Sequence, residues 1–194
     1  VNNCGPSQGF PACNDAYYYF TPNDSIAVVS DLNTFPVNQN ICKVKRPVGI
    51  GSHNGLAYNP FDSCLYYQVP LNFFTSSTLI KMDANCDTTS IITLQTMGGK
   101  SSGSIDLCNR YFSFDHPYIV SVDLTTFQSD SITTSGVPTS VVDLDYNPKN
   151  CSYYIIAAGD VYLVDSGGQY LYGTTDVTRT LSLDVNSPKI KEIF

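Results

Sequence analysis

Short apolar and aromatic stretches alternate with polar turns along the whole chain. Examples are AYYYF at 16–20, LIKMD at 79–83 and SYYII at 152–156. Val, Ile, Tyr, Phe and Thr favour strands, and successive residues of a strand face opposite sides of its sheet. The Asp, Asn, Ser, Gly and Pro residues between the stretches are typical of turns. Because helix-forming residues are scarce as well, the pattern predicts an all-β protein made of short strands.

Two landmarks recur along the chain with a period of about 42 residues. A cysteine stands just ahead of an aromatic strand, and a second strand ends in aspartate. The cysteines are Cys13, Cys64, Cys108 and Cys151, and the aspartates are Asp31, Asp83, Asp123 and Asp165. An aspartate suits a turn because its carboxylate accepts hydrogen bonds from backbone N–H groups two residues on. Four strands in each period predict a β-propeller of four-stranded blades.

The predicted blades make one propeller domain over residues 1–194. The blade units are 12–50, 54–97, 102–136 and 139–176, followed by a partial unit at 178–194. The first unit lacks an opening strand, whereas the C-terminal end carries a surplus one. We expect a ring of about four to five blades, closed by the C-terminal strand in cis or by donation in trans to a neighbouring molecule. A third alternative is that the chain is part of a longer propeller.

Seven cysteines and two glycosylation sequons indicate an oxidising, extracellular setting. No C-x-x-C motif is present, so disulfides that staple the blades are favoured over a zinc site. Cys64–Cys86 is the preferred pair, and the odd count leaves one thiol free or available to another chain. The sequons begin at Asn23 and Asn150. The disulfide candidates are Cys4, Cys13, Cys42, Cys64, Cys86, Cys108 and Cys151.

Charge and hydropathy narrow the classes of partner. The net charge of −7 argues against nucleic acid, because phosphate binding needs a basic surface. No stretch reaches the roughly 18 apolar residues of a membrane-spanning helix. Since the numbering starts at Val1 without a signal peptide, we expect a mature or excised secreted chain.

The stretch HNGLAYNPFDSCLYYQV at 53–69 carries a repeated blade motif. The matching residues are Asn54, Gly55, Leu56, Tyr58, Asn59, Pro60, Asp62, Leu65 and Tyr66. A second copy keeps Leu144, Tyr146, Asn147, Pro148 and Tyr153. The motif resembles that of a poorly characterised family of secreted β-propellers. The resemblance implies the fold and carries over no catalytic residues. The residues themselves predict that Asn59–Asp62 is the turn between the first two strands of a blade, because Pro fixes φ and Asn or Asp accepts the turn geometry.

Few residues offer catalytic or metal-binding chemistry. A Ser-His-Asp or Cys-His site needs a histidine, and the two histidines, His53 and His116, are interpreted as turn or loop residues. Weak candidates for a site on the central axis are Asp106, Asp143, Asp145, Asp184 and His53. Such carboxylates could bind Ca²⁺ or act as a glycosidase pair, whereas the simpler interpretation places them at solvated strand ends.

The sequence therefore predicts a non-catalytic extracellular protein with no cofactor. The expected role is structural or adhesive: a self-assembling glycoprotein subunit of a fibre, coat or matrix. Its expected partners are copies of itself, other extracellular proteins or glycans. The alternative is a propeller that binds a ligand, a glycan or Ca²⁺, with or without hydrolysis, on its central axis.

Overall fold

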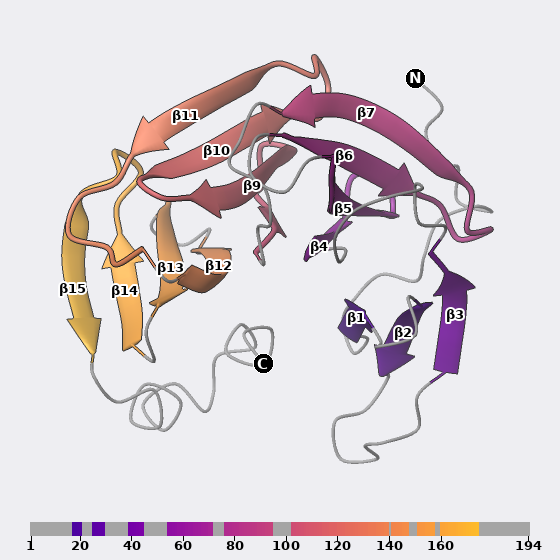
Figure 1. The fold of residues 1–194 in the computed structure, drawn as a ribbon, viewed down its shortest axis with the longest axis horizontal. Helices are drawn as coiled ribbons and strands as arrows, with labels where there is room; N and C mark the ends of the chain where they lie inside the picture. The colour runs from indigo at the N-terminus through magenta and orange to yellow at the C-terminus, as the bar shows by residue number, and fades with distance from the viewer. Residues whose placement is uncertain are drawn as a thin grey trace. The chain divides into compact units, whose positions relative to one another are not determined.

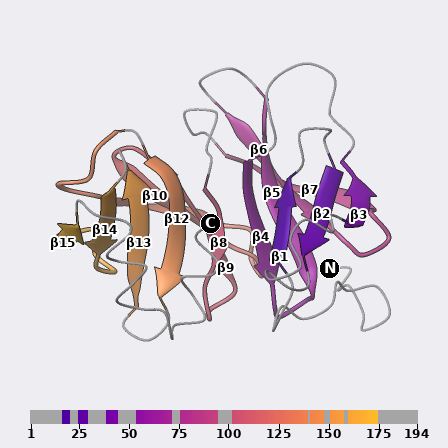
Figure 2. The same ribbon diagram turned by 90° about the horizontal axis from the view of Figure 1, so that it is seen from below.

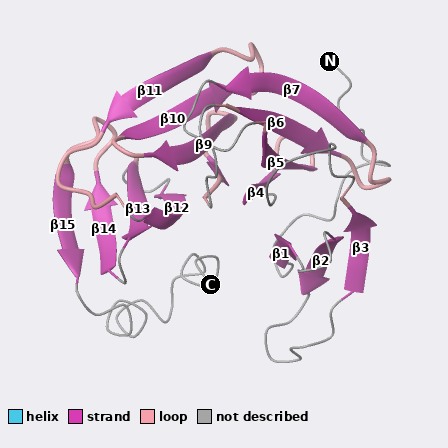
Figure 3. Ribbon diagram, viewed as in Figure 1, coloured by secondary structure: helices cyan, strands magenta, loops and turns pink. Residues whose placement is uncertain are grey.

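The protein is described by a computed structural model in which two compact units follow one another along the chain. The N-terminal unit spans Val1–Gly99 and the C-terminal unit spans Lys100–Phe194. The structure describes residues 17–20, 25–29, 39–44, 54–71, 76–94, 102–139, 141–147, 151–157 and 160–174. All described secondary structure is strand and turn, which confirms the predicted all-β class (Figure 3).

The N-terminal unit contains two antiparallel sheets whose strands follow one another in chain order (Figure 1). The described strands of the first sheet are β1 (Tyr17–Phe20), β2 (Ser25–Val29) and β3 (Gln39–Lys43). The second sheet contains β4 (Asn54–Asn59), β5 (Cys64–Pro70), β6 (Ser77–Met82) and β7 (Thr88–Leu94). Each strand pairs with the next, so both sheets are simple meanders.

The C-terminal unit also contains two antiparallel meanders, each of four strands. The first has β8 (Ser104–Ile105), β9 (Arg110–Asp115), β10 (Tyr118–Asp123) and β11 (Ser129–Thr133). The second has β12 (Val141–Asn147), β13 (Ser152–Ala157), β14 (Asp160–Val164) and β15 (Tyr170–Thr174). Figure 2 shows β12 beside β13 within this second sheet.

Burial changes across each sheet in a way that the residue types explain. All seven residues of β5 are buried, and its sequence CLYYQVP is apolar or aromatic at most positions. In contrast, the outer strand β7 begins with three exposed residues, TTS, and β11 is mostly exposed. The apolar strand β5 therefore lies in the core, while the polar strands β7 and β11 face water over much of their length.

Each unit has its own hydrophobic core. In the N-terminal unit, Leu65 and Tyr67 of β5 pack with Ile26 of the first sheet. In the C-terminal unit, Phe112 of β9 packs with Tyr153 of β13, at a ring-centroid distance of 5.2 Å. Aromatic second strands thus pack neighbouring sheets together within a unit.

The predicted role of aspartate at strand ends is confirmed where the structure describes it. In a five-residue arrangement that we call the Asp turn, the N–H groups two and four residues on donate to the aspartate Oδ1 at 2.8–3.0 Å. The fourth residue has a positive φ, which lets the chain reverse. The turns begin at Asp83, Asp106 and Asp165, with φ values of 66° at Cys86, 59° at Asn109 and 84° at Gly168.

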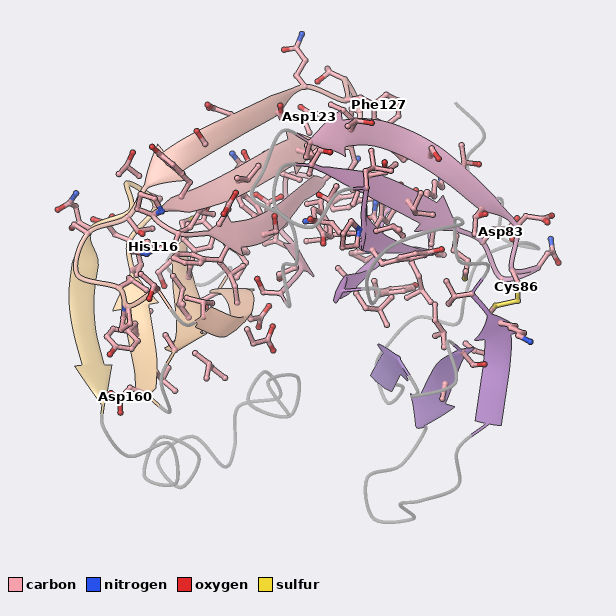
Figure 4. The ribbon with its side chains drawn as sticks, viewed as in Figure 1. Asp83, Cys86, His116, Asp123, Phe127 and Asp160 are labelled. Atoms are coloured by element: carbon pink, nitrogen blue, oxygen red, sulfur yellow. A yellow bond between two sulfur atoms is a disulfide. The ribbon has the colours of Figure 1, made fainter. Side chains whose placement is uncertain are left out.

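Asp123 closes a turn that is one residue longer, and Figure 4 labels it beside Phe127. Its Oδ1 accepts hydrogen bonds from the N–H groups of Thr125 and Thr126, at 2.7 and 2.9 Å. These bonds, led by that from Thr126, lower the pKa of the exposed Asp123 carboxyl. Asp31, the remaining aspartate of the series, lies outside the described residues.

The Asn-Pro-Phe-Asp turn lies between β4 and β5, as predicted. Asn59 Oδ1 accepts the N–H of Phe61 at 2.9 Å, and Asp62 Oδ1 accepts the N–H of Cys64 at 3.1 Å. The other Asp62 oxygen accepts the Tyr66 hydroxyl and pairs with Lys81 Nζ at 2.8 Å. The side chains of the repeated motif therefore build a turn.

The predicted Cys64–Cys86 disulfide is wrong. Cys86 is bonded to Cys42, while Cys64 is disulfide-bonded elsewhere. The physical reason is that the turn containing Cys86 packs against β3 of the preceding sheet, where its Sγ lies 3.3 Å from the Ile41 carbonyl oxygen. The disulfide thus joins neighbouring sheets of the N-terminal unit instead of two turns of one sheet.

Among the described residues, no helix has the length and apolar character needed to cross a lipid bilayer.

Candidate functional site

Two carboxylates lie close together on β12, the opening strand of its sheet. Along this strand, Leu144 and Tyr146 are buried in the core, so the alternating residues Asp143 and Asp145 share the opposite face. A β-bulge between Val141 and Asp143 interrupts the pairing with β13 just before the first of them. Bulges commonly redirect side chains next to functional sites. We call Asp143 and Asp145 the carboxylate pair.

Ser104 of β8 fixes one member of the carboxylate pair. Its hydroxyl donates a hydrogen bond of 2.7 Å to Asp145 Oδ1, and the same Oδ1 accepts the N–H of Tyr146 at 2.8 Å. In contrast, Asp145 Oδ2 is buried and has no hydrogen-bond partner among the described residues. Burying a carboxylate oxygen without a hydrogen bond costs folding free energy, so such an oxygen is a candidate for binding or catalysis.

Asp143, the other member of the pair, has a carboxyl group whose pKa lies near neutral pH. Burial raises the pKa of Asp143 to about 7, and the negative charge of Asp145 contributes to the rise. A hydrogen bond of 2.8 Å from the N–H of Leu144 opposes it. A carboxyl group with a pKa near 7 can both take up and release a proton at neutral pH, as acid–base chemistry requires.

Asp106, predicted as another axial candidate, has a different role. It starts an Asp turn, and its buried carboxylate pairs with Arg110, with Oδ2 lying 2.9 Å from Nε and 2.7 Å from the second terminal nitrogen. The backbone N–H of Asp106 donates to the Arg110 carbonyl oxygen at the end of the hairpin. Further from the turn, Ser104 pairs with Phe112 in one sheet, and Asp145 pairs with Tyr154 in the next. Ser104, and not Asp106, is therefore the residue of its sheet that corresponds to Asp145.

Ser104 was missed because its equivalence to Asp145 depends on turn length. Counting back from the aromatic second strand, as the sheet register does, would have identified it.

His116 lies in the turn between β9 and β10, as predicted, and is labelled in Figure 4. Its Nδ1 is buried without a hydrogen-bond partner among the described residues, and its ring lies 6.1 Å from that of Phe114. The remaining predicted site residues lie outside the described part of the chain: His53, Asp184, Asn23, Asn150, Cys4 and Cys13.

Metal ligands do not gather in the part of the chain that the structure describes. No group of three or more His, Cys, Asp or Glu side chains is placed to hold a metal ion there. Most strand-end carboxylates are already used by turns, since Asp83, Asp123 and Asp165 each accept two backbone N–H groups. Asp143 and Asp145 therefore offer two ligands, fewer than the three that catalytic zinc sites take from the protein.

Comparison with known families finds a peptidase similarity in the second half of the chain. Residues 108–194 match the model of metallopeptidase family M24. A probable Xaa-Pro aminopeptidase P of Paracoccidioides brasiliensis (strain Pb03) is 46% identical over 65 residues, which cover 34% of this chain and 10% of that protein. Aminopeptidase P2 of Arabidopsis thaliana is 33% identical over 90 residues, 46% of this chain and 12% of that protein. The chain thus matches about a tenth of the length of these relatives.

Comparison with solved structures reports on the fold alone. A chain from the crystal structure of a nidogen/laminin complex aligns with a TM-score of 0.60 and 9% identity, covering 84% of this chain and 60% of that one. Virginiamycin B lyase from Staphylococcus aureus aligns with a TM-score of 0.54 and 9% identity, covering 85% and 57%. These neighbours are propeller-like, in agreement with four antiparallel meander sheets.

The sequence comparisons correct three predictions. The predicted non-catalytic structural or adhesive role is contradicted by the metallopeptidase and aminopeptidase matches. For the same reason the expectations of no enzyme and of no cofactor are wrong. No metal-ligand spacing such as C-x-x-C or H-E-x-x-H in residues 108–194 marks this similarity in the sequence.

Proposed function

We propose that the protein takes part in the metal-dependent removal of N-terminal residues from peptides, with a site to which residues 108–194 contribute. The observation that carries this proposal is the similarity of that segment to metallopeptidase family M24. The aminopeptidase P relatives suggest peptides with proline as the second residue as the first substrates to try.

The carboxylate pair supports a hydrolytic role within this segment. Peptide hydrolysis needs a group that exchanges protons near neutral pH, and Asp143 has a pKa of about 7. Asp145, the next residue on the same face, carries an Oδ2 that has no hydrogen-bond partner in the described part of the chain. We assign to Asp143 the acid–base role and to Asp145, held by Ser104, the role of keeping the Asp143 pKa high.

The ligands of the proposed metal are not assigned, because the described residues do not form a group of three metal-binding side chains. Further acids of the matched segment, Asp176, Asp184 and Glu192, lie outside the described residues. We therefore derive no catalytic step through a metal from this structure, and look for its ligands by mutagenesis.

The test is an aminopeptidase assay on the purified chain with Xaa-Pro tripeptides, with added Mn²⁺ or Zn²⁺ and with EDTA. We expect metal-dependent release of the N-terminal residue and a loss of at least about tenfold in kcat for Asp143→Asn. Asn variants of Asp145, Asp176 and Asp184 and a Gln variant of Glu192 then locate ligands, with exposed Asp130→Asn as the control. An absence of metal-dependent hydrolysis in the folded chain would overturn the proposal, whereas full activity of Asp143→Asn would overturn only its acid–base role.

We also propose that the four sheets are blades of a closed propeller, with residues 178–194 completing the sheet of β1, β2 and β3. Three sheets have four described strands and this one has three, which supports the proposal. The test is deletion of 178–194 with measurement of mass in solution and of the free energy of unfolding. Closure in cis predicts a destabilised monomer, and donation in trans predicts that oligomers of the full chain become monomers. No change in either quantity would contradict closure.

Secretion as a glycoprotein related to the propellers with the repeated blade motif remains a proposal. The Cys42–Cys86 disulfide and the sequons at Asn23 and Asn150 support it. Expression through a secretory pathway should give a product whose mass falls on deglycosylation, with a smaller fall for Asn23→Gln and Asn150→Gln. A product without N-glycans would contradict it. In that setting, copies of the chain, other extracellular proteins or glycans are its proposed partners.

A further inference from the structure

Two cysteines of the C-terminal unit, Cys108 and Cys151, are free and exposed. Each lies in the turn that closes the first hairpin of its sheet. Cys108 follows β8 and precedes β9, whereas Cys151 follows β12 and precedes β13. We call Cys108 and Cys151 the thiol pair.

The two hairpins lie side by side with their turns at the same end. Ser104 of β8 donates to Asp145 of β12 at 2.7 Å, so the opening strands are in contact at this level. Each of these two strands reaches its turn two residues later, β8 at Asp106 and β12 at Asn147. Both turns therefore follow directly after the level at which Ser104 contacts Asp145.

The second strands confirm that the hairpins pack together close to the turns. The Phe112 ring lies 5.2 Å from that of Tyr153 and 6.1 Å from that of Tyr146. Tyr153 is two residues beyond Cys151, and Arg110, two residues beyond Cys108, places its guanidinium 5.1 Å from the centre of the Phe112 ring.

Electrostatic effects connect the same two turns. A hydrogen bond with the Cys151 side chain raises the pKa of the Tyr146 hydroxyl, followed in effect by burial and by the charges of Cys151 and Asp106. Burial would lower the pKa of Arg110, but its hydrogen bond and charge interaction with Asp106 raise it overall, with a smaller contribution from Cys108. Asp106 thus influences both Tyr146, which is hydrogen-bonded to Cys151, and Arg110, which lies near Cys108.

We propose that Cys108 and Cys151 are a thiol pair that closes to a disulfide between the two hairpin turns on oxidation. One thiolate attacks a low-molecular-weight disulfide such as glutathione disulfide, forming a mixed disulfide and releasing one glutathione. The second thiolate then displaces the other glutathione, so the protein loses two protons and two electrons and two glutathione molecules are formed. The bond staples neighbouring sheets in the C-terminal unit, as Cys42–Cys86 does in the N-terminal unit.

The proposal does not depend on the peptidase function. It assigns a partner within the chain to two cysteines that would otherwise be reactive surface thiols in an oxidising compartment. It also implies that the odd cysteine of the seven is one outside the thiol pair.

The test is treatment of the folded, full chain with glutathione disulfide, followed by proteolysis and mass spectrometry without reduction. We expect one peptide pair linked through Cys108 and Cys151, two fewer titratable thiols and a rise in Tm of about 5–10 °C. Cys108→Ser and Cys151→Ser should each abolish the link and the rise, leaving glutathione on the remaining thiol. Urea-unfolded chain is the control, and should lose the preference for this pair.

Three results would overturn the proposal. The first is stable glutathione on both Cys108 and Cys151 of the folded chain. The second is a disulfide between two chains through either cysteine. The third is a Cys108–Cys151 link formed in urea as readily as in the folded protein.

Discussion

The Tyr66 hydroxyl donates a hydrogen bond of 2.7 Å to the Asp62 carboxylate, four residues earlier in the chain. Burial, followed by this bond and by the Asp62 charge, raises the pKa of Tyr66. The same carboxylate oxygen pairs with Lys81 of β6, so one side chain ties the turn after β4 to two further strands. The repeated blade motif is therefore explained by turn architecture.

Removing the Asp62 charge should destabilise the N-terminal unit. Asp62→Asn leaves the largely buried Lys81 without its anion, and we expect the free energy of unfolding to fall by about 2–3 kcal/mol. Tyr66→Phe removes only a hydrogen bond and should cost about 1–2 kcal/mol. Urea denaturation of both single variants and the double variant measures their coupling. Strict additivity would contradict a shared network.

The Asp106–Arg110 pair offers a matched test in the C-terminal unit. The Asp106 side chain is fully buried, while 41% of the Arg110 side chain is exposed. Arg110→Gln should lower the free energy of unfolding by about 1–3 kcal/mol, because a buried carboxylate loses its cation. Adding Asp106→Asn should recover part of this loss, since an amide oxygen still accepts both turn N–H groups. Exposed Lys43→Gln is the control, and an equal effect there would show that the pair contributes nothing specific.

Two neighbouring glycines should lose very different amounts of stability when changed to alanine. A Cβ on Gly168 would collide with the Thr133 carbonyl oxygen, and Gly168 has a φ of 84°. We expect Gly168→Ala to cost about 2–4 kcal/mol. A Cβ on Gly167 would meet only Asp165 Oδ1, at 3.3 Å, so Gly167→Ala should cost less than about 1 kcal/mol. Chemical denaturation decides, and equal losses would contradict the close approach of this turn to the end of β11.

Stability should depend on pH through Asp143. Its pKa rises from 3.8 to about 7 on folding, so between these values the folded state holds a proton that the unfolded state has released. Unfolding then releases a proton, and the free energy of unfolding falls as pH rises until it levels off above about pH 7. Asp143→Asn should remove this part of the pH dependence and Asp130→Asn should retain it. Urea titrations from pH 4 to 8 measure both, and an unchanged slope in Asp143→Asn would contradict the assignment.

Much of the fold could be predicted from local chemistry. Strand-end aspartates such as Asp83 and the Asn-Pro-Phe-Asp turn act within a few residues of themselves, so their geometry is written in the nearby sequence. The Cys42–Cys86 pair could not be predicted in this way, since it depends on how one sheet packs against the next.

The candidate site was predicted in part. Asp143 and Asp145 share a face because side chains alternate between the two faces of a strand, and this can be predicted from the sequence. The role of Ser104 depends on how two sheets pack, because its hydroxyl donates across them to Asp145. The similarity of residues 108–194 to metallopeptidase family M24 could not be predicted, because no short metal-ligand motif marks it in the sequence.

The Asp turn also accounts for part of the negative charge of the chain. An aspartate carboxylate reaches the N–H groups two and four residues on, whereas glutamate, longer by one methylene, does not favour this local bond. Glu192 is accordingly the only glutamate among the 17 acidic residues. Four of these negative charges, at Asp83, Asp106, Asp123 and Asp165, thus come from closing hairpins. An Asn at the same positions would keep the acceptor oxygen while removing the charge. These negative charges have a structural role in the turns, whether or not they also bind a partner.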